Sequence, residues 1–306
     1  MKQLCLIMWM ICFTMEAQTN RALIVTIGQY PPESGWELIH TENDRRLTFN
    51  LLIDNHYNPQ DIQILSNSQA TKGNIVEAFN NLFDRCRKDD YIYIHFSCHR
   101  QQMMDDNGDE DDGLDEALIP YDALFWYLPD TYEGKNHLRD DELGKWLLKL
   151  RNKIGQNGQI IVVLDACHSG TGNRDNNENS YVRGTSRIFA PDNYVPLKGK
   201  HPELDLKLEQ SPKLAPTLVI SACKADQNNY EYYSQSNRSY YGVLSFCMAN
   251  VLGKELKGKQ WSVKTLTEKI HAKMQTLNRP YIYRKQQPYI EYSDKNHLYN
   301  LSNPNK

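Results

Sequence analysis

Residues 159–170 read Gln-Ile-Ile-Val-Val-Leu-Asp-Ala-Cys-His-Ser-Gly, a continuous apolar run that ends in an acid, a thiol and an imidazole. Runs of this kind are too continuous for half-exposed strands, so they predict the buried strands of a mostly parallel sheet. Helical apolar spacing occurs between the runs, and the alternation predicts an α/β fold with a six-stranded sheet and helices on both faces. The expected strands cover residues 21–27, 61–65, 91–97, 159–165, 217–222 and 288–292. The expected helices cover residues 41–56, 72–86, 140–152, 242–252 and 262–277.

The composition limits the classes of partner. The chain has 306 residues, of which 40% are hydrophobic, so it can bury a sizeable core. Its 35 Lys and Arg residues stand against 38 Asp and Glu residues, a formal net charge of -3. No global basic field exists to hold nucleic acid or an anionic membrane, and we expect neither as a partner of the mature chain.

The first 17 residues have the pattern of a signal peptide. A basic start at Lys2 precedes an apolar run, residues 4–13, that is too short to span a bilayer. We therefore expect export, to a periplasm or out of the cell, after removal of residues 1–17. Five cysteines then remain, an odd number, so at least one thiol is unpaired: Cys86, Cys98, Cys167, Cys223 and Cys247.

Two of the predicted strands end in reactive side chains. His99 follows residues 91–97 by two positions, and Cys167 follows residues 159–165 by two positions. Because neighbouring parallel strands end at the same sheet edge, about 4.8 Å apart, the thiol and the imidazole can approach each other. This is a pairing of nucleophile and base. The alternative for Cys167 is a buried strand-end thiol, and His168 is the competing imidazole.

Two motifs, His-Phe-Ser-Cys-His-Arg at 95–100 and Asp-Ala-Cys-His-Ser-Gly at 165–170, resemble the catalytic motifs of the metacaspases, which are caspase-like cysteine peptidases. The resemblance extends over residues 20–295 and includes residues 42–44, 109–116 and 139–142. It implies a caspase-like three-layer sandwich in a single domain, residues 18–300. Within that domain we expect a larger portion at 20–170, a loop at 171–213 and a smaller portion at 214–295.

The resemblance also implies a cysteine endopeptidase that cuts proteins or peptides after Arg or Lys. Cys167 would be the nucleophile and His99 the base, with backbone N–H groups of Arg100 and Cys167 binding the oxyanion. Carboxylates near a nucleophile select cationic side chains, and the metacaspase resemblance assigns Asp44 and Asp165 to the first specificity pocket. The alternative role for Asp44 is a charge at a helix N-terminus. The expected substrate-binding residues are Asp44, Ser97, Asp165 and Asp226.

Calcium activation is a trait of the family, and clustered carboxylates suit hard cations. The spacing of the acidic segment 103–116 does not fit an EF-hand. By resemblance the expected calcium ligands are Asp112, Asp115, Asp140 and Asp141. No cofactor is expected to be required for the chemistry itself.

The chain departs from the family pattern on both sides of His99, where Cys98 and Arg100 replace glycines. Two hypotheses follow: Arg100 places its guanidinium on Asp44 or Asp165, or Cys98 forms a disulfide with Cys167 or Cys223. Basic residues in the long loop are candidate self-cleavage sites, which would make the chain a zymogen: Arg174, Arg183, Arg187, Lys198 and Lys200.

Two rival functions are also consistent with the sequence. One is a caspase-fold module of low or no activity that binds basic peptides. The other is a zinc site built from thiols and imidazoles at the same edge, although no close pair of cysteines supports it. For the peptidase, the resemblance favours a monomer.

Overall fold

The computed structural model describes residues 18–166, 181–197, 206, 208–224, 227–278 and 286–302. The predicted leader at 1–17, the nucleophile Cys167 with His168, Asp226, and the basic residues Arg174, Lys198 and Lys200 lie outside the described residues.

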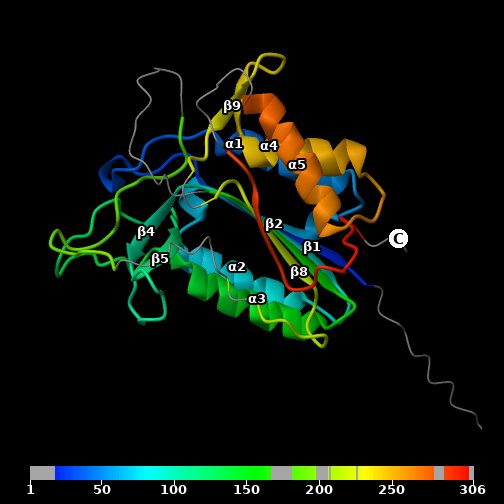
Figure 1. The fold of residues 1–306 in the computed structure, drawn as a ribbon, viewed down its shortest axis with the longest axis horizontal. Helices are drawn as coiled ribbons and strands as arrows, with labels where there is room; N and C mark the ends of the chain where they lie inside the picture. The colour runs from blue at the N-terminus through cyan, green and yellow to red at the C-terminus, as the bar shows by residue number, and fades with distance from the viewer. Residues whose placement is uncertain are drawn as a thin grey trace, which may run out of the picture.

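A six-stranded sheet forms the middle layer of the molecule (Figure 1). Its order is β11-β8-β7-β3-β1-β2, and all pairs are parallel except β11 with β8. The predicted strands and the mostly parallel sheet are confirmed. The strands are β1 (Asn20–Thr26), β2 (Ile62–Ser66), β3 (Tyr91–Ser97), β7 (Gln159–Asp165), β8 (Thr217–Ser221) and β11 (Tyr289–Tyr292).

Helices cover both faces of this sheet (Figure 1). On one face α1 (Thr41–Ile53), α4 (Val243–Asn250) and α5 (Val263–Asn278) pack on the strands, and α4 continues into a π-helical turn, Val251–Glu255. On the other face lie α2 (Lys72–Arg85) and α3 (Asp140–Ile154). None of the helices in the described ranges is long and apolar enough to cross a membrane.

Local sequence explains where α2 and α3 begin and end. Thr71 caps α2, because its hydroxyl accepts the N–H of Asn74. The first turn of α3 holds three acids and its last turn holds Arg151 and Lys153, which complements the helix dipole. Gly155 then ends α3 with a positive φ of 68°.

Two small sheets were not predicted. The acidic segment is partly a β-meander, since β4 (Arg100–Met104) pairs with β5 (Leu114–Leu118), and β5 pairs with β6 (Leu138–Arg139). A hairpin of β9 (Glu231–Ser234) and β10 (Ser239–Gly242) precedes α4. The strands of both small sheets are short and carry many polar residues, so their apolar alternation is too weak to mark them as strands.

The carboxyl ends of β1, β3 and β7 define one edge of the sheet. The strand order reverses between β1 and β3, and in open α/β sheets this is where ligands bind. The register pairs Ser97 at the end of β3 with Asp165 at the end of β7. The chemistry-bearing residues that follow these strands are therefore held at a common edge by the most buried part of the fold.

Candidate active site

Asp44 lies in the first turn of α1 but does not cap that helix. Its carboxylate is fully buried and accepts hydrogen bonds from the Ser97 hydroxyl (2.8 Å) and from the backbone N–H of Gly242 (2.9 Å). Burial and the nearby charge of Asp165 raise the pKa of Asp44 to about 6, against the opposing effect of Arg183. A buried carboxylate of this kind is suited to meeting a cation.

Asp165 is the last residue of β7 and is also fully buried. One of its oxygens accepts from the backbone N–H (2.8 Å) and hydroxyl (2.6 Å) of Ser245, and the other accepts from the Asn229 amide (2.8 Å). These bonds hold the carboxylate in one orientation. The sequence-predicted residues Asp44, Ser97 and Asp165 are thus brought together, while Asp226 lies outside the described residues.

The guanidinium of Arg183 fills the space between these acids. Arg183 is fully buried, and its Nη1 lies 2.7 Å from Asp44 Oδ2 and 3.6 Å from Asp165 Oδ2. The same nitrogen donates to the Ser97 hydroxyl at 2.8 Å. The prediction treated Arg183 as one of several basic loop residues, but here it is the most buried cation at the edge that the sequence associates with catalysis.

A third carboxylate, which the prediction missed, completes the acidic cluster of Asp44, Asp165 and Glu231. Glu231 Oε1 accepts from Arg183 Nη2 at 2.8 Å and from Nε at 3.2 Å. Its other oxygen lies 2.6 Å from His40 Nδ1. Burial raises the pKa of Glu231, but Arg183 and His40 outweigh this effect and the net pKa is lowered. Glu231 is therefore a charged partner of the guanidinium.

The backbone around Arg183 is held as an added strand. The Arg183 N–H donates to the Asn229 carbonyl at 2.9 Å, and the Glu231 N–H donates to the Tyr181 carbonyl at 3.0 Å. Between them Val182 forms an antiparallel bridge with Tyr230. Strand addition of this type is a general way for proteins to bind extended peptides. The segment 181–183 therefore lies against residues 229–231, where β9 begins, as a bound peptide would.

His99 is a buried neutral imidazole. Burial lowers its pKa to about 4, so it is uncharged at neutral pH. Its Nε2 lies 2.8 Å from the Glu37 carbonyl, which can only accept, so Nε2 carries the proton. Nδ1 then holds the lone pair, and it has no hydrogen-bond partner among the described residues. Stacking of the ring on Trp36, with centroids 4.9 Å apart, fixes this orientation.

The residues on either side of His99 do not behave as the two hypotheses expect. Arg100 forms a buried ion pair with Glu116 at 3.0 Å, so the hypothesis that Arg100 lies on Asp44 or Asp165 is wrong. Cys98 is a free, buried thiol whose pKa is raised to about 12 by burial. The hypothesis of a Cys98 disulfide is therefore wrong in this structure.

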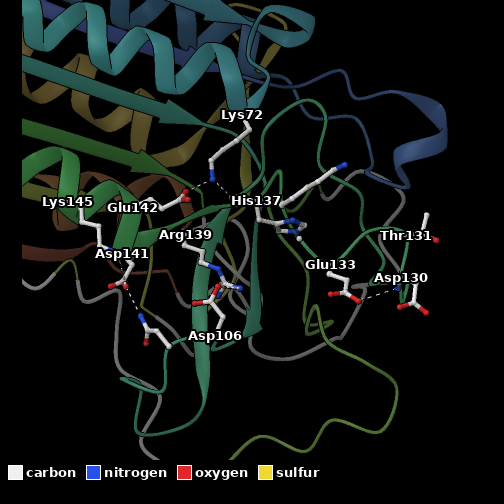
Figure 2. Close-up of a pocket in the computed structure, with 13 residues that line it drawn as sticks. Lys72, Asp106, Asp130, Thr131, Glu133, His137, Arg139, Asp141, Glu142 and Lys145 are labelled. Atoms are coloured by element: carbon white, nitrogen blue, oxygen red, sulfur yellow. Dashed lines mark hydrogen bonds and ion pairs between the residues drawn. The ribbon is translucent and has the colours of Figure 1, made fainter.

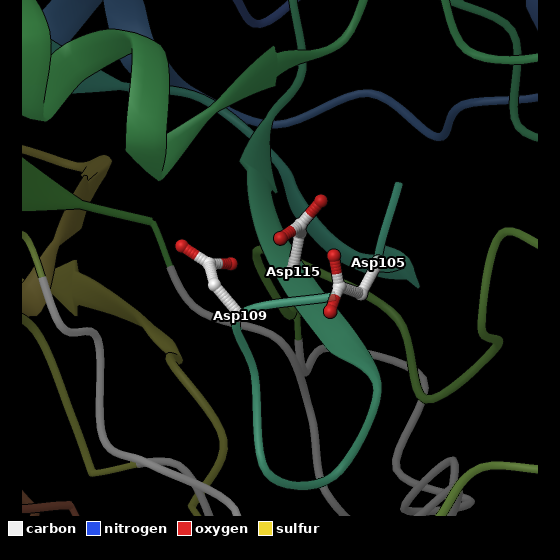
Figure 3. Close-up of side chains that lie close together, drawn as sticks. All are labelled: Asp105, Asp109 and Asp115. Carbon is white, nitrogen blue, oxygen red and sulfur yellow. The ribbon is translucent and has the colours of Figure 1, made fainter. Parts of the chain in front are cut away.

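The acidic segment brings together a different set of carboxylates from the predicted one (Figure 3). Oxygens of Asp105, Asp109 and Asp115 lie within 4.8 Å of one another. Asp115 also pairs with Arg139, and both Asp105 oxygens accept backbone N–H groups of the same turn. Of the predicted ligands only Asp115 belongs to this group.

The other predicted calcium ligands have separate surroundings. Asp112 accepts the N–H of Leu114. Asp141 lies 3.7 Å from Lys145 and accepts from the Asn107 amide. The pKa of Asp140 is raised to about 7 by burial and by Glu116. Among the described residues, the four predicted calcium ligands therefore do not gather at one site.

A pocket of about 660 Å³ lies along the starts of α2 and α3 and shares no residue with the acidic cluster (Figure 2). Its lining carries charges of both signs, and several of them are paired, such as Lys72 with Glu142 and Arg139 with Asp106. His137 on its wall is buried, and burial lowers its pKa to about 3. The paired charges give the pocket no clear preference for a cation or an anion.

Comparison with known proteins places the chain in a family. The family model described as "Metacaspase, peptidase C14 domain" matches residues 20–173, and the chain belongs to this family. It is 30% identical over 159 residues to Metacaspase-1 of Pyricularia oryzae and 31% identical to Metacaspase III c of Phaeodactylum tricornutum. These matches cover 50% of this chain but only 37% and 43% of the two relatives.

A solved structure supports the fold over a longer range. The crystal structure of protein GSU0716 from Geobacter sulfurreducens matches with a TM-score of 0.58 and 20% identity, covering 90% of this chain and 93% of that one. The resemblance stated from the sequence motifs and the predicted α/β fold are both confirmed.

Proposed function

We propose that the chain is a cysteine endopeptidase that cleaves proteins or peptides after Arg or Lys. The observation that carries this proposal is the position of Arg183, whose side chain is surrounded by three carboxylates while its backbone is paired as an added strand. An Arg or Lys of a substrate would replace Arg183 in the same place. Family membership supports the reaction class.

His99 supplies the base in this proposal. With the proton on Nε2, the lone pair of Nδ1 accepts the proton of the Cys167 thiol, and the resulting thiolate attacks the scissile carbonyl carbon. The imidazolium then protonates the departing amine, and water hydrolyses the thioester with His99 again as the base. The developing oxyanion would be bound by the backbone N–H groups of Arg100 and Cys167.

Covalent labelling tests the proposal directly. The reduced protein is incubated with a Tyr-Val-Arg chloromethylketone, and the labelled residue is mapped by mass spectrometry. We expect alkylation of Cys167 and none in the Cys167→Ala variant, with a matched Asp chloromethylketone reacting at least 100-fold more slowly. Equal labelling by the Asp reagent would contradict the basic specificity, and labelling elsewhere would contradict the nucleophile.

Self-processing follows from the same arrangement. The bond between Arg183 and Gly184 is the one that a cut after the bound arginine would break, and this selects Arg183 from the five predicted basic residues. The active-site Cys167→Ala variant should stay intact, whereas the wild-type chain should yield a new N-terminus at Gly184. An intact wild-type chain that hydrolyses peptides at full rate would contradict self-processing.

Calcium remains a proposed activator. We propose Asp105 and Asp109 as ligands, with Asp115 shared between the ion and Arg139, because oxygens of the three acids lie within 4.8 Å of one another. Isothermal titration calorimetry of calcium binding to wild-type and Asp109→Asn protein tests this ligand set. Equal affinity in both would contradict the role of this group.

Export, with removal of residues 1–17, and a monomeric state complete the proposal. They rest on the N-terminal sequence pattern and on the family resemblance. N-terminal sequencing and the mass in solution of the protein recovered from its source test both.

The rival function is a module that binds basic peptides without turnover. The observation in its favour is that the chain's own segment 181–183 is bound where a substrate would lie. Binding of an Arg peptide to a chain that never forms a covalent adduct would favour this rival.

A further inference from the structure

Tyr181 makes ring contacts that the basic specificity does not explain. Its ring packs edge-on against His40, with centroids 4.7 Å apart, and against Tyr240, with centroids 4.9 Å apart. His40 and Tyr240 stack on each other at 4.8 Å. The His40 and Tyr240 rings thus form an aromatic stack, and the Tyr181 ring lies edge-on to both of them.

Tyr181 lies two residues before Arg183 in the segment that pairs with residues 229–231. In an extended strand, residues i and i+2 point to the same side. Tyr181 and Arg183 therefore face the wall formed by α1, β9 and β10, and Val182 points away from it. The contacts of Tyr181 are those that the third residue before a scissile bond would make when the first is arginine.

The aromatic stack of His40 and Tyr240 is held by some of the same residues as the acidic cluster. The His40 backbone N–H donates to Glu231 Oε1 at 2.7 Å, and its Nδ1 lies 2.6 Å from Glu231 Oε2. The Asn43 amide donates to the Tyr240 carbonyl at 2.8 Å, which ties β10 to α1. Because Glu231 also binds the Arg183 guanidinium, one carboxylate fixes both His40 and the cation.

We propose that His40 and Tyr240 form a second specificity subsite that selects an aromatic side chain two residues before the basic one. The substrate class is then a protein or peptide segment of the form aromatic-x-Arg or aromatic-x-Lys. This inference rests on the proposed peptidase function, since it assigns the neighbouring subsite of the same reaction. Offset and edge-to-face aromatic pairs add affinity beyond the area that they bury.

Matched reporter peptides test the subsite. Wild-type protein is assayed with Tyr-Val-Arg, Phe-Val-Arg, Ala-Val-Arg and Tyr-Ala-Arg reporters. We expect kcat/KM for the Tyr and Phe peptides to exceed that for Ala-Val-Arg about tenfold, and the change of Val to Ala to matter less than threefold. Equal rates for Tyr-Val-Arg and Ala-Val-Arg would overturn the subsite while leaving the peptidase in place.

Variants locate the effect. Tyr240→Ala should remove the tenfold preference, and Tyr240→Phe should keep it because the ring face is retained. Tyr292→Ala on β11 is the control, since its side chain is partly exposed on a strand at the far edge of the sheet. A preference that survives Tyr240→Ala would place the selectivity elsewhere and contradict the assignment.

Failure of the function and failure of the subsite can be told apart. The catalytically inactive Cys167→Ala/Tyr181→Ala/Arg183→Ala chain, whose own segment no longer fills the two subsites with side chains, is tested for binding of labelled Tyr-Val-Arg and Ala-Val-Arg amides by fluorescence anisotropy. If no reporter is hydrolysed but the Tyr amide binds about tenfold more tightly, the subsite stands and the peptidase proposal falls. If the two amides bind equally, the subsite itself is contradicted.

Discussion

Among the described residues, two groups of three carboxylates each include an acid that is paired with an arginine, and the two groups differ in how they are built. Asp44, Asp165 and Glu231 come from α1, β7 and β9, are buried, and surround Arg183. Asp105, Asp109 and Asp115 come from one turn and the strand after it (Figure 3). Arg139 contacts Asp115.

The difference between the two groups shows which carboxylates can select a basic side chain. In the turn, Asp105 accepts backbone N–H groups and Asp109 is exposed, so the loss of either charge costs little, whereas Asp115 is buried against Arg139. The acidic cluster is held in place by elements that are distant in sequence, and it is shielded from solvent. Because water cannot stabilise its buried charges, they need a cationic side chain as a partner. Selectivity for a basic side chain should therefore depend on the buried cluster and hardly on the turn.

The largest expected effect comes from neutralising one carboxylate in each group. Asp44→Asn keeps the shape of the side chain but removes a charge 2.7 Å from the guanidinium position. Removing one partner of a buried pair costs about 3 kcal/mol or more, so kcat/KM for an Arg peptide should fall about 100-fold. Asp109→Asn should change it less than twofold in calcium-free buffer. Similar losses in both variants would erase the distinction between the two groups.

A glycine beside the acidic cluster gives the next largest effect. A Cβ at Gly242 would lie 2.1 Å from Asp165 Oδ2 and 2.3 Å from Arg183 Nη1. Gly242→Ala should therefore lower kcat/KM for an Arg peptide about tenfold and destabilise the fold by about 1–3 kcal/mol.

The matched control is Gly73→Ala in α2, where a Cβ meets nothing within 4 Å. It should stabilise the protein by about 0.5–1 kcal/mol through helix propensity and leave peptide turnover unchanged. Thermal denaturation and kinetics on both variants check the pair. Full activity in Gly242→Ala would mean that the cluster is looser than the structure shows.

The pH dependence should separate KM from kcat. Because the pKa of Asp44 is raised to about 6, this carboxyl gains a proton, and loses its attraction for a cation, as pH falls through 6. KM for an Arg peptide should then rise by up to about tenfold for each pH unit below 6. The pKa of His99 near 4 keeps the base neutral, so kcat should hold until lower pH. A KM that stays flat from pH 7 to 5 would contradict Asp44 as a charged contact.

The smallest expected effect on turnover comes from Arg100. Since Arg100 pairs with Glu116 and not with the acidic cluster, Arg100→Gly should not raise turnover of an Arg peptide. It should instead destabilise the protein by about 3–5 kcal/mol, because Glu116 is left buried without its partner. Arg100→Gly/Glu116→Gln should recover part of that stability. A several-fold gain in turnover by Arg100→Gly would return this arginine to the substrate site.

Much of the fold could be predicted because the central strands are continuous apolar runs between amphipathic helices. The strand ends then placed Asp165 and Ser97 at one edge, and the motif resemblance added Asp44. The β4–β5–β6 meander and the β9–β10 hairpin were missed because their strands are short and polar, as in Glu231-Tyr-Tyr-Ser.

Glu231, Tyr181 and the special position of Arg183 were missed for a different reason. Their roles arise from long-range contacts, for example between His40 and Glu231, 191 positions apart, which local periodicity does not encode. One signal was available: Tyr-Val-Arg at 181–183 is a short β-prone stretch inside an otherwise polar loop. The same long-range dependence explains why Arg100, adjacent to His99 in sequence, pairs with Glu116 instead of the acidic cluster.

The central claim is that the buried acidic cluster binds the basic side chain of the substrate, while Cys167 and His99 carry out the reaction. Its most direct test is the hydrolysis of Tyr-Val-Arg, Tyr-Val-Lys and Tyr-Val-Asp reporters by reduced wild-type and Cys167→Ala protein, with and without calcium. We predict kcat/KM for Arg and Lys at least 1,000-fold above that for Asp, corresponding to about 4 kcal/mol, and no turnover in the variant. Comparable cleavage after Asp, or turnover that survives Cys167→Ala, would contradict the account.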